Sequence, residues 1–112
     1  MNRTEKHEEI RKKMDAIIYS IALKEANGDV GKVIKTQTDY VMYIVDEQNR
    51  FIDNIIKEFD EEEKDEIYCM TIDEIINDVF SDNDFNNFMK MLEELLVMFN
   101  NDLNCEGYKN DK

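Results

Sequence analysis

Residues 41–59 read VMYIVDEQNRFIDNIIKEF, and this stretch decides between a helical and a mixed fold. Its apolar positions alternate by four and three residues, which is the spacing of one helix face rather than the two-residue alternation of a strand. The stripe consists of Val41, Val45, Gln48, Ile52, Ile55 and Phe59, flanked by Ile44, Phe51 and Ile56. The same register extends back through Thr38 to Ile34. We therefore predict one long helix from about Thr36 to about Glu62.

The part of the chain just before this stretch is open to a second interpretation. Residues 32–45 are rich in β-branched and aromatic side chains, which favour strands. The alternative fold is therefore α+β, with a short hairpin within 32–50. No Asn-Gly or Asp-Gly turn lies in that range, which favours the helix.

Aspartates recur every seven residues along the predicted helix, at Asp39, Asp46, Asp53 and Asp60. A basic residue follows each of the last three by four positions, at Arg50, Lys57 and Lys64. This order predicts ordinary ion pairs on one helix, which would neutralise most of the row.

Other helices follow from apolar spacing and from capping signals. A helix is predicted over residues 4–26, because Asn27 and Gly28 tolerate the left-handed backbone that ends a helix. Two capping motifs, Thr71 with Glu74 and Ser81 with Asp84, predict a short helix near residues 71–80 and a final helix from Phe85 to about Leu103. The final helix is apolar on most sides, so we expect it at the centre of the fold or in a dimer interface.

The predicted fold class is all-α, a small bundle of four to five helices. We expect a single helical domain over residues 1–103 and a polar, disordered tail over 104–112. No signal peptide or membrane span is recognisable, and Cys69 and Cys105 are isolated, so we expect a cytoplasmic protein with reduced thiols. The single histidine, His7, leaves no base for a nucleophile. We therefore expect no enzyme activity and no cofactor.

Charge is the most informative property of the sequence. The net charge is -13, and it divides into +2 for residues 1–35 and -15 for residues 36–112. Residues 58–84 contain twelve carboxylates and one basic residue, Lys64. Such a surface repels nucleic acid and anionic membranes, and it attracts basic protein surfaces. The residues predicted to bind a partner are Glu58, Asp60, Glu61, Glu62, Glu63, Asp65, Glu66, Asp73, Glu74 and Asp78.

These properties predict a small acidic interaction module or inhibitor. Its target would present a basic surface, as nucleic-acid-binding proteins do, and the carboxylates would pair with arginines that hold phosphate. In size and charge the chain resembles small phage or plasmid inhibitors of defence nucleases that mimic nucleic acid. The alternative is a homo-oligomeric structural or regulatory protein, such as a homodimer, in which the long helix and the last helix bury apolar faces.

A divalent-metal site is a further alternative. Asp82, Asp84, Asn86 and Glu93 occupy positions 1, 3, 5 and 12 of an EF-hand loop, although Asn87 stands where that loop needs glycine. Residues 62–66 read EExxE, with Glu74 and Asp78 downstream, a pattern that resembles the magnesium motifs of the all-α, MazG-like nucleotide pyrophosphohydrolases. The resemblance would imply magnesium-dependent cleavage of a triphosphate. Ile75 stands where the second motif of that family has glutamate, and we do not assign the family.

Overall fold

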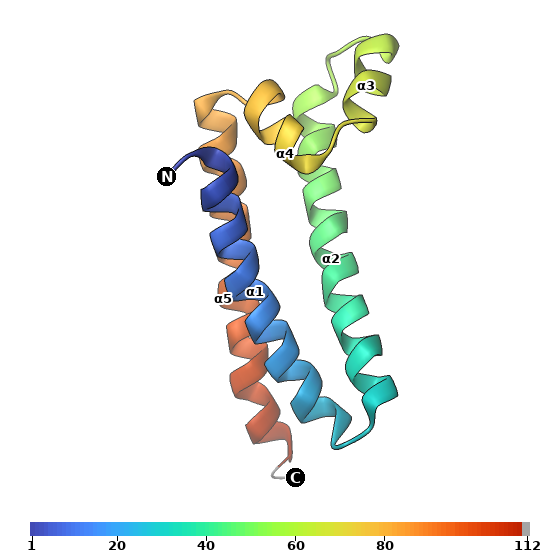
Figure 1. The fold of residues 1–112 in the computed structure, drawn as a ribbon, viewed down its shortest axis with the longest axis vertical. Coiled ribbons are helices and arrows are strands. Elements are labelled where there is room, and N and C mark those ends of the chain that lie inside the picture. The colour runs from blue at the N-terminus through green and yellow to red at the C-terminus, as the bar shows by residue number, and fades with distance from the viewer. Residues whose placement is uncertain (111–112) are drawn as a thin grey trace.

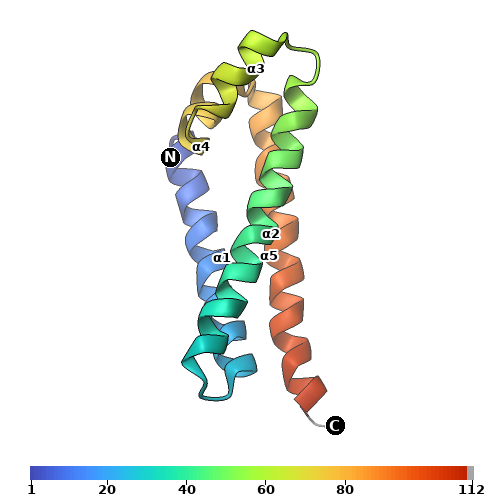
Figure 2. The same cartoon turned by 90° about the vertical axis from the view of Figure 1, so that its right-hand side faces the viewer.

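The protein is a bundle of three long helices whose one end is crossed by three short helical segments (Figures 1 and 2). A computed structural model describes residues 1–110, and the side chains of residues 1–105. The elements are α1 (Arg3–Ala26), α2 (Val30–Ile56), α3 (Glu61–Tyr68), α4 (Ile72–Glu74), η1 (Ile75–Val79) and α5 (Asp82–Asn110). No strand occurs in this described part of the chain, so the all-α prediction is confirmed and residues 32–50 form no hairpin.

The bundle is elongated, with extents of 52 × 27 × 21 Å, and α1 is its central helix. α1 packs extensively against both α2 and α5, whereas α2 and α5 contact each other only sparsely. The last helix is therefore not the central one, and the alternative that it lies in a dimer interface stays a prediction. α5 is amphipathic in the structure, because Phe88, Leu92 and Phe99 are buried while Val97 and Met98 face solvent.

A tight turn joins α1 to α2, as the sequence predicts. Asn27 caps α1 in the left-handed region (φ 48°), and Gly28 follows at φ 94°, where a side chain would be strained. Asp29 then accepts hydrogen bonds from the backbone N–H groups of Gly31 and Lys32, which starts α2 at Val30. The long helix thus begins earlier than predicted and ends earlier, at Ile56.

The buried stripe of α2 differs from the predicted one. Ile34 and Val41 are 60% and 37% exposed, whereas Ile44 and Ile56, predicted as flanking positions, are fully buried. The buried residues Ile44, Gln48, Ile52 and Ile56 repeat every four positions. A four-residue row winds slowly around a helix, and such rows pack into the grooves of a neighbouring helix. The four-three spacing therefore predicts a longer buried stripe on α2 than the structure has.

The segments at the end of the bundle form largely as their caps predict. Thr71 and Glu74 make the expected capping box at α4, and Ser81 and Asp84 exchange hydrogen bonds of 3.0 and 3.3 Å at the start of α5. Residues 75–79 form a π-helical turn in which the Phe80 N–H donates to Ile75 O at 3.1 Å. The sequence predicts a helix here but not its wider turn.

Aromatic and aliphatic residues from five elements make the core beneath this end. The rings of Phe51, Phe80 and Phe88 lie 5.3–5.6 Å apart, and Ile67, Ile75 and Ile76 are buried around them, as are α1 residues such as Met14 and Ile18. α5 continues to Asn110, beyond its predicted end at Leu103, and residues 111–112 of the predicted tail lie outside the described residues. Of the helices described, none has the length and apolarity needed to cross a lipid bilayer.

Candidate protein-binding surface

The predicted partner-binding residues gather at one end of the bundle, which we call the acidic cap (residues 58–78). Glu58 and Asp60 lie in the connection after α2, five acidic residues lie on α3, Asp73 and Glu74 lie on α4, and Asp78 lies on η1. These short segments run across the end where α2 finishes and α5 starts, as Figure 1 shows. Nine of the ten predicted side chains belong to exposed residues, and Asp73 is half-buried.

Some of these carboxylates maintain local structure. Asp60 caps α3 by accepting the Glu63 N–H at 2.8 Å, and Glu74 bonds back to the N–H and hydroxyl of Thr71. Glu61 lies 3.8 Å from the ammonium group of Lys64. These three acids therefore have a role in folding that does not depend on any partner.

The other carboxylates of the cap are available to a partner. Within the described part of the chain, no ion pair or hydrogen bond engages the side chains of Glu58, Glu62, Glu63, Asp65, Glu66 and Asp78. The one basic residue within the cap, Lys64, is already beside Glu61. An unpaired set of exposed negative charges on a small area creates a field that attracts cationic surfaces.

The ion pairs predicted between Asp46, Asp53 and Asp60 and the basic residues four positions later do not form. Arg50 pairs with Glu47 at 2.7 Å instead of Asp46, and Lys64 pairs with Glu61 instead of Asp60. Asp53 accepts a hydrogen bond of 2.9 Å from the Tyr68 hydroxyl. The prediction that this row of aspartates is neutralised is therefore wrong.

The negative charge of the cap affects the pKa of the Tyr68 hydroxyl. Its pKa is raised above the usual value, first because its hydroxyl donates to Asp53 and then because of desolvation and the negative charges of Asp53, Glu61 and Asp65. Sequence reasoning could not predict the contact between Tyr68 and Asp53, because the two residues lie on different helices. Asp53 thus adds a carboxylate to the edge of the cap that was missing from the prediction.

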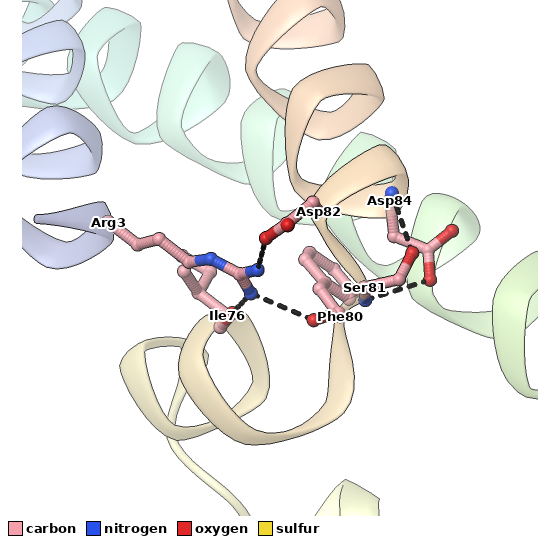
Figure 3. Close-up of polar contacts among 6 residues, drawn as sticks. All are labelled: Arg3, Ile76, Phe80, Ser81, Asp82 and Asp84. Atoms are coloured by element: carbon pink, nitrogen blue, oxygen red, sulfur yellow. Dashed lines mark hydrogen bonds and ion pairs between the residues drawn. The ribbon is translucent and has the colours of Figure 1, made fainter.

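An arginine from the other end of the sequence fixes the cap on the bundle. Arg3 Nη1 donates to the carbonyl oxygens of Ile76 (2.6 Å) and Phe80 (2.8 Å), and Nη2 donates to Asp82 (2.6 Å), as Figure 3 shows. Its guanidinium carbon lies 5.2 Å from the centre of the Phe85 ring. These contacts join the start of α1 to η1 and to the first turn of α5, so they set where the cap stands.

His7 makes a second connection between α1 and the cap. It is buried, its ring centre lies 5.8 Å from that of Phe88, and its Nδ1 lies 3.8 Å from Asp73 Oδ1. Burial lowers the pKa of His7, the charge of Arg11 lowers it further, and the charges of Asp73 and Glu8 oppose this. Neutral His7 is therefore the form that the fold favours.

The structure gives no EF-hand loop at the four residues considered for calcium. Asp82, Asp84, Asn86 and Glu93 all lie on the continuous helix α5. Asp82 pairs with Arg3, and Asp84 bonds to Ser81. Residues 62–66 lie on α3, apart from Glu74 on α4, so the pattern that resembles a magnesium motif is divided between two elements. Within the described residues, no group of three or more His, Cys, Asp or Glu side chains could hold a metal ion.

Comparisons with known proteins add no further constraint on the role of this surface. No protein-family model matches the sequence, and neither curated protein sequences nor solved structures give a significant match.

Proposed function

We propose that the protein is a small acidic binding module that covers a basic surface of a target protein. The observation that carries this proposal is the set of exposed cap carboxylates that no described residue pairs with, including Glu62, Glu63 and Glu66 on one short helix. Each can accept hydrogen bonds from arginine or lysine, and arginine can bind a carboxylate through two parallel bonds. The cap is held by buried contacts beneath it, so a target would meet a preformed surface rather than ordering one.

The target class that best fits is a nucleic-acid-binding protein. Its basic groups are spaced to hold phosphates, and a surface of carboxylates can occupy the same groups. The protein would then act as an inhibitor by mimicry of nucleic acid, without a catalytic step. We place this activity in the cytoplasm, a compartment in which the exposed free thiols Cys69 and Cys105 would stay reduced.

Two variants with equal charge test whether the cap itself is the binding surface. The cap variant carries Glu62→Gln, Glu63→Gln and Glu66→Gln. The body variant carries Asp46→Asn, Glu93→Gln and Glu94→Gln, which are also exposed and have no described partner. Each changes the net charge by the same amount, so a nonspecific effect of total charge affects both equally.

The assay is affinity capture from nuclease-treated lysate of the source cells, with low-salt and high-salt washes and quantitative mass spectrometry. We expect wild type and the body variant to retain the same nucleic-acid-binding protein, and the cap variant to lose it. High salt should release it, because exposed charge pairs are screened. Equal retention by both variants, or retention of a target without a basic surface, would contradict the proposal.

Self-association is a second candidate, and one observation favours it. Tyr19 and Leu23 of α1, and Ile34 and Val41 of α2, are large apolar residues that remain exposed in the single chain. Exposed apolar side chains of this kind can become buried between copies. Sedimentation equilibrium of wild type and of an Ile34→Ser, Val41→Ser variant tests it: a dimer that the variant abolishes supports this function, and a wild-type monomer at high concentration excludes it.

A further inference from the structure

A second candidate binding site lies where α2 and α5 meet, away from the acidic cap. A pocket of about 300 Å³ is lined there by Asp39, Tyr40 and Tyr43 of α2 and by Met98, Phe99 and Asp102 of α5. From Tyr43 to the end of α2 at Ile56 is about 20 Å of helix, so the pocket and the cap are separate surfaces of the molecule.

Three aromatic rings meet in this pocket at steep angles. The rings of Tyr40 and Phe99 lie 4.9 Å apart at 88°, and those of Tyr43 and Phe99 lie 6.3 Å apart at 66°. Phe99 is 1% exposed and Tyr40 is half-buried, so Tyr43 supplies the most exposed of the three rings. Tyr43 is 43% exposed, so its ring remains in contact with solvent. Aromatic faces carry partial negative charge and attract cations within about 6 Å.

Carboxylates from both helices add full negative charge beside these rings. The Tyr40 hydroxyl donates to Asp102 Oδ2 at 3.0 Å, which holds this carboxylate against the aromatic group. Asp39 lies 3.6 Å from Lys35 on the same helix, with both side chains mostly exposed, and an ion pair of this kind contributes little. None of the six lining residues is cationic. The pocket therefore combines a hydrophobic floor with two acids and no cationic lining residue, and Lys35 lies beside one of the acids, Asp39.

We propose that this pocket binds an arginine side chain of a partner protein. A guanidinium group stacks flat on aromatic faces while it donates hydrogen bonds to carboxylates, and it loses less hydration than an ammonium group. The volume is at the lower limit for small-molecule sites, which suits one side chain. The proposal does not depend on the function of the acidic cap, because none of the residues that line the pocket lies within residues 58–78.

The test uses two probes that differ in charge and little in shape. N-acetyl-arginine methylamide and its neutral analogue, N-acetyl-citrulline methylamide, are titrated separately into the ¹⁵N-labelled full chain, and amide shifts are followed by NMR. We expect saturable shifts for the arginine probe, concentrated at residues 39–43 and 98–102. Binding of the citrulline probe should be weaker by about tenfold or more, because citrulline has no charge with which to make a cation–π contact in the pocket.

Variants then assign the binding to the aromatic pocket. Tyr43→Leu keeps an apolar side chain but removes the ring, and Tyr19→Leu is its control, because Tyr19 is 50% exposed on α1. We expect Tyr43→Leu to weaken arginine binding by about fivefold or more, and Tyr19→Leu and the cap variant to leave it unchanged. Equal binding of both probes to wild type, shifts confined to residues 58–78, or equal effects of the two tyrosine variants would each overturn the proposal.

Discussion

Removing the guanidinium of Arg3 should destabilise the protein far more than removing an ordinary surface arginine. Arg3 joins η1 and the start of α5 to α1 through three hydrogen bonds, and its side chain is only 23% exposed. The change is Arg3→Met, which keeps the unbranched apolar stem and removes the charge and all donors. The matched control is Arg50→Met, since Arg50 makes a 2.7 Å contact with Glu47 but is mostly exposed.

The size of the effect follows from the three contacts of Arg3. Hydrogen bonds that involve a charged group contribute about 1.5–3 kcal/mol each, but the Arg3 side chain is 23% exposed, so water can enter its place in the variant and bind the Ile76 and Phe80 carbonyls. The pair with Asp82 adds about 0–1 kcal/mol, because that carboxylate is 97% exposed. We therefore expect a loss of about 2–3 kcal/mol for Arg3→Met. Arg50→Met should cost less than about 1 kcal/mol.

Urea unfolding followed by circular dichroism measures both variants on one scale. At about 4 °C per kcal/mol for a chain of this size, Arg3→Met should also lower Tm by about 8–12 °C. Losses that agree within about 0.5 kcal/mol between Arg3→Met and Arg50→Met would refute the role assigned to Arg3.

Three further predictions concern the buried residues. Because the folded state favours neutral His7, the unfolded chain binds more protons than the folded chain as pH falls below about 6.5. The free energy of unfolding should therefore fall from pH 7 to pH 5.5. The Tm of His7→Gln should decrease less than that of wild type over this range. Gln48 is buried, and its amide Nε2 has no partner among the described residues, so Gln48→Leu should raise the free energy of unfolding by about 1 kcal/mol. A lower free energy of unfolding in a urea titration of the variant would contradict this. Met14→Ala should lower the free energy of unfolding by about 2–5 kcal/mol, because Met14 is fully buried. Met42→Ala, on the exposed face of α2, should lower it by less than about 0.5 kcal/mol. Equal decreases in Tm for the two variants would disagree with the described packing.

The features that could be predicted from the sequence are those specified by neighbouring residues. The left-handed stop at Asn27 and Gly28 and the capping box of Thr71 and Glu74 each need only a few residues, and both form as predicted. The long helix was identifiable because its apolar spacing persists over many turns. The prediction of its buried face was less accurate, because Ile34 and Val41 match the apolar pattern but lie outside the surface that α1 covers.

The contacts that fix the candidate surface were out of reach of sequence reasoning. Arg3 and Ile76 are separated by most of the chain, and so are His7 and Asp73, so no spacing rule connects them. Exposure of the acidic residues followed from their charge, because unpaired carboxylates are rarely buried. The pairing of Arg50 with Glu47 shows the limit of that reasoning: on a helix, positions three and four apart compete, and the sequence does not say which one a long side chain selects.

The salt dependence of target binding tests most directly whether the acidic cap is the interface. For the target recovered by capture, Kd is measured for wild type, the cap variant and the body variant over a series of salt concentrations. We predict that the cap variant binds about tenfold more weakly at low salt, as expected for three exposed pairs of about 0.5 kcal/mol each, and that its affinity changes less with salt. The body variant should bind like wild type. If the cap and body variants have the same Kd and the same salt dependence, the cap is not the binding surface.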